Sequence, residues 1–123
     1  MSKHVARIPL VVGTAGAVAQ AATEYSQSTN FRYTDESASL LLSTTAGSIT
    51  VSQQCSMNNV DWYDPYDAAG NLIAVVATAQ GVTTGKWIAY NPAMAPYTRF
   101  KVVEGNSAPT VVTIELMIQE DNT

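Results

Sequence analysis

The clearest structural signal in this chain is the segment Pro109-Thr-Val-Val-Thr-Ile-Glu-Leu-Met-Ile-Gln119. Every second residue from Val112 to Ile118 is aliphatic, whereas the positions between them include Thr113 and Glu115. Successive side chains of a β-strand point to opposite faces of its sheet, so this period of two predicts a long strand with one face in a core.

Shorter segments upstream repeat this pattern between turn-forming residues. Pro9 favours an edge position for the first of them, since proline donates no hydrogen bond to a neighbouring strand. Short strands separated by turn signals predict an all-β fold, a single antiparallel β-sandwich or jelly roll with an extended N-terminal arm. The strands are expected at residues 5–12, 38–43, 48–56, 71–77, 84–90 and 97–103.

Two turn-rich links follow strands in this prediction. Residues 104–109 follow the strand at 97–103, and residues 44–47 follow the strand at 38–43. Both links are short and contain Gly, so each predicts an antiparallel hairpin with the next strand.

The N-terminal third of the sequence is less regular. Residues 15–25 fit either a short helix or an extended linker, because Gly and Thr lower helix propensity. We expect residues 1–36 to form an N-terminal arm and linker that partly joins the sheet, and residues 37–123 to form the β-sandwich core.

The composition indicates one domain with few charges. The chain has 123 residues, of which 13% are charged, against about 25% in typical soluble domains. A neutral surface fits a protein partly covered by neighbouring subunits, and a weakly charged monomer is the alternative. The net charge of −4 argues against nucleic-acid binding, which relies on clustered Lys and Arg.

Residues 8–22 imitate a secretory signal, because a basic start precedes an apolar and small-residue run. Pro9, Gly13 and Gly16 interrupt this run, and it is shorter than the roughly 20 residues of a membrane span. We therefore expect neither secretion nor a membrane partner. The single cysteine, Cys55, excludes an intrachain disulfide, and we expect it to act as a small buried apolar residue.

The chain lacks the usual residues for catalysis. Nucleophilic mechanisms need a base beside the nucleophile, and the only histidine is His4. The sequence holds no phosphate-binding glycine motif. We expect a protein that is not an enzyme, with no catalytic residue and no cofactor.

Three carboxylates, Asp61, Asp64 and Asp67, stand three residues apart in one loop. The EF-hand uses ligands two residues apart, so the spacing fits calcium poorly. Asp, Pro and Gly are common in turns, and we expect a structural turn with no bound metal, ahead of calcium binding and of a glycosidase pair.

Aromatic residues cluster in the same loop and recur at Trp87 and Tyr90. Trp and Tyr combine an apolar ring with a polar tip and commonly anchor interfaces. We expect a core or interface role for them, with stacking on carbohydrate as the less favoured alternative.

Two segments resemble those of a known class of proteins. They are Gln54-Cys-Ser-Met-Asn-Asn-Val-Asp-Trp-Tyr-Asp64 and Ala95-Pro-Tyr-Thr-Arg-Phe-Lys-Val-Val103. With the final alternating strand, they resemble small β-sandwich proteins of tailed-phage virions, in which one strand ends in a Ser-x-Asp/Asn-Gly/Asn-x-x-Trp turn and a later strand reads Pro-Tyr-x-Arg-Phe-Lys/Arg-Val. The resemblance spans roughly residues 48–120, and similar strings occur in capsid decoration proteins, tail proteins and some adhesion modules.

The resemblance implies a virion component, usually oligomeric, that clamps neighbouring major capsid subunits. It predicts a non-enzymatic decoration or cement protein on the capsid surface that forms a homo-oligomer, a dimer or trimer, and binds the major capsid protein. A tail or head-to-tail structural protein and a carbohydrate-binding β-sandwich module are the alternatives.

Two groups of residues are the expected partner contacts. An N-terminal arm can add a strand to an exposed sheet edge of a neighbour, and aromatic residues can anchor an interface. The expected contacts are Val5, Arg7, Ile8, Leu10 and Val12 in the arm, and Trp62, Tyr63, Tyr66 and Trp87 elsewhere.

Overall fold

The computed structural model describes residues 3–30, 34–90, 92–93 and 95–121. This part of the chain forms ten β-strands and no helix, which confirms the all-β prediction. Accordingly, it contains no helix of the length and apolarity that a bilayer crossing needs. The strands are β1 (Lys3–Leu10), β2 (Ala17–Val18), β3 (Thr23–Tyr25), β4 (Thr29–Asn30), β5 (Thr34–Thr44), β6 (Ser48–Ser56), β7 (Val75–Gln80), β8 (Lys86–Tyr90), β9 (Tyr97–Glu104) and β10 (Thr110–Asp121).

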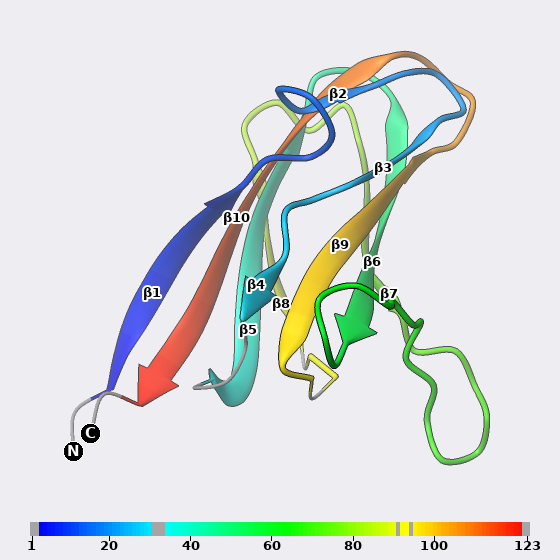
Figure 1. Ribbon diagram of the computed structural model, residues 1–123. Helices are drawn as coiled ribbons and strands as arrows, with labels where there is room; N and C mark the ends of the chain where they lie inside the picture. Colours follow the sequence, from blue (N-terminus) through cyan, green and yellow to red (C-terminus); the bar gives the residue numbers. More distant parts are fainter. Residues whose placement is uncertain (1–2, 31–33, 91, 94, 122–123) are drawn as a thin grey trace.

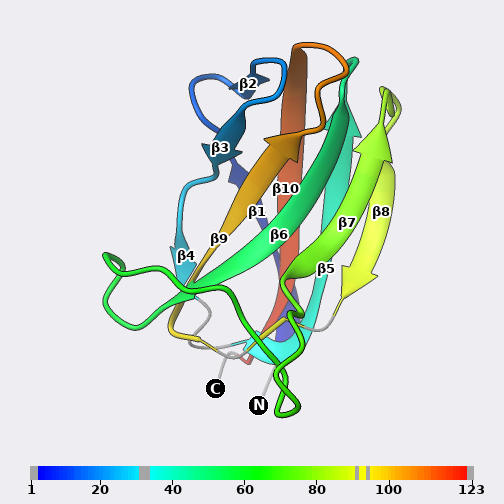
Figure 2. The ribbon, with the colours of Figure 1, turned by 90° about the vertical axis from the view of Figure 1, so that its right-hand side faces the viewer.

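The strands form two five-stranded antiparallel sheets that pack as two layers (Figures 1 and 2). The first sheet has the order β1-β10-β5-β8, with β2 beside β10. The second has the order β3-β9-β6-β7, with β4 beside β9. With β2 set aside and β3 and β4 taken as one position, eight strands remain in the double-Greek-key arrangement of a jelly roll. The structure thus selects the jelly roll among the predicted sandwich topologies.

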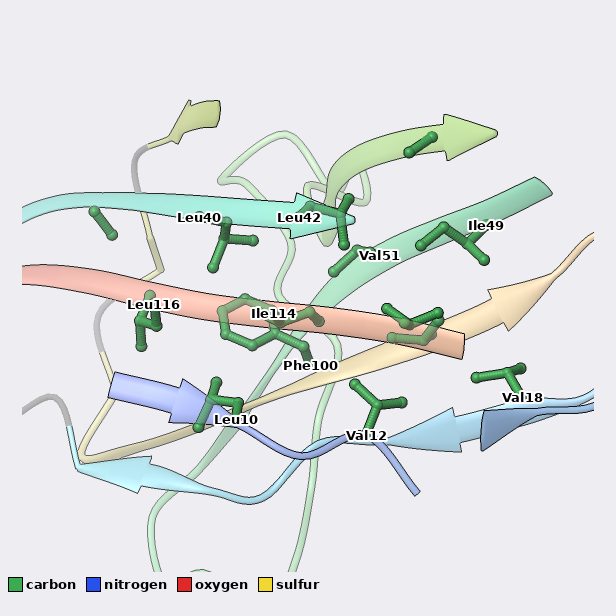
Figure 3. Close-up of a cluster of buried hydrophobic side chains, with 14 of the residues drawn as sticks. Leu10, Val12, Val18, Leu40, Leu42, Ile49, Val51, Phe100, Ile114 and Leu116 are labelled. Carbon is green, nitrogen blue, oxygen red and sulfur yellow. The ribbon is translucent and has the colours of Figure 1, made fainter. Parts of the chain in front are cut away.

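The core lies between the two sheets and follows the alternation in the sequence. The four aliphatic residues of β10 at alternate positions are all buried, and those of β6 and β9 face them from the other layer (Figure 3). Phe100 is fully buried and is the largest such side chain. Complete burial of a side chain of this size contributes roughly 1.5–3 kcal/mol to the free energy of unfolding. The central members of the cluster are Leu40, Leu42, Ile49, Val51, Phe100, Val102, Val112, Ile114, Leu116 and Ile118.

The two predicted hairpins are wrong. β9 pairs with β6 and β10 pairs with β5, so the link at residues 105–109 crosses from one sheet to the other. The link at residues 45–47 likewise joins β5 of the first sheet to β6 of the second. A short turn with Gly serves a hairpin and a sheet-crossing connection equally well, which is why the turn residues did not distinguish the two.

The N-terminal segment is part of the sandwich. β1 pairs along its whole length with β10 of the same chain, from Lys3↔Asp121 to Leu10↔Ile114, and it lies at the edge of its sheet, as Pro9 predicted. Leu10 and Val12 then enter the core. The expected boundary at residue 36 falls inside β5. The described part of residues 1–36 thus contributes β1 to β4 to the two sheets.

Two further expectations are resolved by the structure. Residues 15–25 take the extended alternative, with β2 and β3 separated by a turn in which Ala21 has a φ of 60°. The strand expected at 71–77 begins only at Val75, because Asn71 and its neighbours belong to the preceding loop.

Candidate partner interface on the loop between β6 and β7

The loop at residues 57–74 connects β6 to β7 and projects from one end of the sandwich (Figures 1 and 2). Most of its large apolar side chains are exposed, although burial would stabilise them. Single exposed apolar residues are ordinary, whereas several on one projecting segment are typical of an interaction site. We call these residues the loop surface: Met57, Val60, Tyr63, Tyr66, Leu72 and Ile73, with exposed fractions between 51% and 77%.

Side-chain oxygens hold the first half of the loop in one shape. Asn58 Oδ1 accepts hydrogen bonds from the backbone N–H groups of Val60 and Asp61, both at 2.9 Å. Asn59 has a φ of 62°, a left-handed conformation that Asn adopts more readily than most residues. The backbones of Cys55 and Tyr63 exchange two hydrogen bonds of 2.9 Å. Tyr63 is thus attached directly to β6.

The second half of the loop closes as a small turn around Asp67. Its Oδ1 atom accepts hydrogen bonds from the backbone N–H groups of Asn71 at 2.8 Å and Ala69 at 3.0 Å. These bonds, above all the one from Asn71, lower the pKa of the Asp67 carboxyl. The N–H of Ile73 donates to the carbonyl of Pro65 at 3.0 Å. The loop surface is therefore displayed on a hydrogen-bonded scaffold.

The three aspartates of the loop do not meet. Asp61 accepts a hydrogen bond from Asn58 Nδ2 at 2.8 Å, and Asp64 accepts one from Gln54 Nε2 at 3.2 Å. Asp67 is engaged in its own turn. Across the described ranges, no three His, Cys, Asp or Glu side chains are grouped as metal ligands would be. Each of the three carboxylates is thus engaged by a hydrogen bond within the loop or from β6.

Trp62 lies against Arg99 of β9 in the second sheet, and the Arg99 guanidinium contacts a second aromatic ring, that of Tyr25. The guanidinium carbon is 4.1 Å from the centroid of the Tyr25 ring and 4.5 Å from that of Trp62. Arg99 Nε also donates to Gln54 Oε1 at 2.9 Å. Cation–π contacts of this kind contribute about 0.5–2 kcal/mol each. Partial burial lowers the pKa of the Arg99 guanidinium.

Sequence analysis missed the role of Arg99. The alternation of residues along β9 shows only that Arg99 faces outward. The resemblance to phage proteins assigned no contact to the Arg of its motif. Its aromatic partners come from β3 and from the loop, so only the fold brings Tyr25 and Trp62 to it.

The structure places two of the expected arm contacts, Leu10 and Val12, in the hydrophobic core. Leu10 is 6% and Val12 is 0% exposed, so both pack in the core of their own chain and leave no surface for a partner. Ile8 is half-buried against the same core. Arg7 is exposed but pairs with Glu115 of β10, with N–O distances of 2.7 and 3.0 Å. The side chain of Val5 lies outside the described residues.

The remaining aromatic residues predicted as partner contacts lie in two separate parts of the structure. Trp87 is 65% exposed on β8, in the first sheet, whereas Trp62, Tyr63 and Tyr66 belong to the loop. The side chain of Tyr90 is outside the described residues. Cys55 is half-buried, and burial raises the pKa of its thiol, which disfavours the reactive thiolate.

Comparison with known proteins gives structural similarity without sequence similarity. No protein-family description and no curated protein sequence matches the chain. The SPBc2 prophage-derived protein YomS superposes with a TM-score of 0.58 and 7% identity over 98% of this chain and 96% of that one. The chain therefore has the same fold as YomS. A Yersinia pseudotuberculosis-derived mitogen gives a TM-score of 0.54 at 9% identity, covering 99% of this chain and 92% of the mitogen.

A third similar structure belongs to a carbohydrate-binding domain. It is the CBM36-1 domain of a multidomain xylanase from the hindgut metagenome of Trinervitermes trinervoides, with a TM-score of 0.50 and 4% identity over 93% of this chain and 96% of the domain. The three superpositions show a common architecture. At identities this low, they carry no assignment of function.

Proposed function

We propose that this protein is a non-enzymatic structural component of a tailed-phage virion that decorates the capsid. In this role it binds neighbouring major capsid subunits through the loop surface and stabilises the head. The observation that carries the proposal is the set of exposed apolar side chains on a loop that hydrogen bonds hold in shape.

A loop with a defined shape suits protein recognition. Association must offset the entropy lost when flexible groups become ordered, so a loop that is already ordered binds with less cost. Tyrosine is enriched among the residues that dominate interface energies. Tyr63 and Tyr66, 64% and 60% exposed, are the expected anchors.

Two further observations support a virion role. The segments at residues 54–64 and 95–103 resemble those of tailed-phage β-sandwich proteins. A prophage-derived protein is among the structures with the same fold. A homo-oligomer, a dimer or trimer, fits the clamping role because several linked contacts increase the overall affinity.

Binding to empty heads of the phage that encodes the chain tests this function. We expect the wild-type protein to cosediment with the heads at a fixed stoichiometry and to raise the temperature at which they rupture. The double variant Tyr63→Ser/Tyr66→Ser should lose binding while its melting temperature stays unchanged. Val111→Ser, an exposed apolar position on β10, is the matched control and should bind as wild type. Wild-type protein that ignores heads would refute the capsid role.

A carbohydrate-binding module is the second candidate, because Tyr63 and Tyr66 present exposed rings on an ordered loop. A glycan array separates the two functions. Tight, Tyr63-dependent binding to a glycan together with no binding to heads would favour this module. Binding to tails in place of heads would favour a tail or head-to-tail structural protein.

A further inference from the structure

Arg99 lies on the outer face of the second sheet with part of its hydrogen-bonding capacity unused. Its Nε atom donates to Gln54, while its two terminal nitrogens make no hydrogen bond to any described residue. The ion pair found in the described ranges joins Arg7 to Glu115 and leaves Arg99 without a carboxylate partner there. A partly desolvated guanidinium with no counterion is costly unless it serves another contact.

The surroundings of Arg99 hold the guanidinium in place. The rings of Tyr25 and Trp62 contact the guanidinium, and Gln54 Oε1 accepts a hydrogen bond from Nε. The Gln54 amide is itself oriented, because its Nε2 donates to Asp64 Oδ1 at 3.2 Å. The group is therefore fixed before any ligand arrives, which reduces the entropy lost on binding.

A second cation stands beside Arg99 on the same face. Lys101 lies two residues further along β9, opposite Tyr25 on β3 and Ser52 on β6. It makes no ion pair with any residue that the structure describes. Arg99 and Lys101 therefore place two cations on one face of the second sheet, where Asp64, bound to Gln54, is the neighbouring carboxylate.

We propose that Arg99 is the recognition site for a carboxylate of the partner protein, an Asp or Glu side chain that docks beside the loop surface. This inference rests on the proposed docking function and names the chemistry of its partner. The planar guanidinium offers two parallel N–H donors, which match the two oxygens of a carboxylate. Lys101 adds a longer-range attraction, and Trp62 links the cation to the loop surface.

Titration with small anions tests the chemistry of the site directly. The probe is sodium acetate, followed by NMR on the side-chain Nε–H signals of arginine. We expect a saturable shift of the Arg99 signal, while Arg7, already paired with Glu115, stays unchanged. The variant Arg99→Lys keeps the positive charge and loses the planar pair of N–H donors. In this variant, the acetate-dependent shifts of the neighbouring Gln54 amide should weaken roughly tenfold. A non-saturating response, or tighter binding of inorganic phosphate than of acetate, would overturn the carboxylate assignment.

Binding to heads tests the role of the site in docking. Arg99→Gln and Arg99→Lys should each lower the affinity by roughly 30-fold or more. Lys86→Gln, which removes an exposed cation from β8 of the first sheet, should bind as wild type, and thermal melting checks that every variant is folded. If the wild type binds heads and the Arg99 variants bind equally well, this inference fails while the proposed function stands. If the wild type does not bind heads at all, the proposed function fails, and acetate binding alone then tests the site.

Discussion

The carboxylate of Glu104, at the end of β9, accepts a hydrogen bond of 3.0 Å from the backbone N–H of Ser48, at the start of β6. It also accepts hydrogen bonds from the N–H groups of Ala21 at 3.0 Å and Ser107 at 2.9 Å. This buried side chain occupies the inward position that follows Phe100 and Val102 on β9. It joins three connections at one end of the sandwich, which explains a charged residue in an otherwise apolar register.

Glu104 should make the fold sensitive to acid. Its backbone partners, Ala21 foremost, lower the pKa of the carboxyl below its ordinary value of 4.5. The stabilisation is therefore complete above that pH and is lost as the pH falls through the lower folded-state pKa. Glu104→Gln should lower the melting temperature by roughly 5 °C or more at neutral pH. It should also flatten the decline of the melting temperature between neutral pH and pH ~3. Thermal melts across this range check both effects, with Glu24→Gln as control; an unchanged acid decline would contradict the assignment.

Adjacent valines provide a matched test of the core. Val12 is 0% exposed and Val11 is 45% exposed. Val12→Ala should lower the free energy of unfolding by about 2–3 kcal/mol, since it removes buried methyl groups and leaves a cavity. Val11→Ala should change it by less than about 0.5 kcal/mol. Urea denaturation measures both values, and equal effects would be inconsistent with the packing described.

Deletion of residues 2–12 distinguishes a strand from a free arm. The deletion removes β1 from β10 and takes Leu10 and Val12 out of the core. Two such side chains contribute roughly 3–6 kcal/mol together, a large part of the 5–15 kcal/mol that stabilises a typical domain. We expect the truncated chain to lose its cooperative thermal transition. A truncated chain that melts like wild type would restore the arm interpretation.

Gly47 is required by close packing between two connections. A Cβ atom at this position would lie 2.7 Å from the carbonyl oxygen of Ala108 and 3.0 Å from Glu104 Oε2. Gly47→Ala should therefore lower the free energy of unfolding by about 1–3 kcal/mol. Gly105→Ala is the control, since the nearest atom would lie 3.6 Å away, and we expect a change within about 1 kcal/mol. Equal denaturation midpoints for the two variants would contradict the close packing at Gly47.

Asn58 should tune binding through the shape of the loop. Asn58→Ala removes the acceptor of the Val60 and Asp61 N–H groups, both exposed to solvent, so stability should change little. Backbone relaxation measured by NMR should show greater motion at residues 58–62, and affinity for heads should fall roughly five- to tenfold because ordering now occurs on binding. Thr83→Ala, outside the loop, serves as control. Greater motion with unchanged affinity would argue against an ordered loop as the binding element.

Much of the strand pattern was readable in advance. The segments at 48–56, 97–103 and 109–119 correspond to β6, β9 and β10 because alternation is a local property with a direct structural cause. The strand predicted at 71–77 begins too early, because Leu72 and Ile73 are apolar yet lie exposed in the loop before β7. Tyr63 and Tyr66 are exposed on that loop, and their role as partner contacts stays a prediction.

The alternation along the chain was enough to establish that the protein is all-β, where most strands lie, and which face of β10 enters the core. The folded chain was needed to show that β5 and β6, like β9 and β10, belong to opposite sheets, and that β1 pairs within its own sandwich. The fold also brings the rings of Tyr25 and Trp62 into contact with Arg99. The reason is physical: alternation follows from the geometry of one strand, whereas pairing, sheet membership and ring stacking depend on contacts between segments that the sequence places far apart.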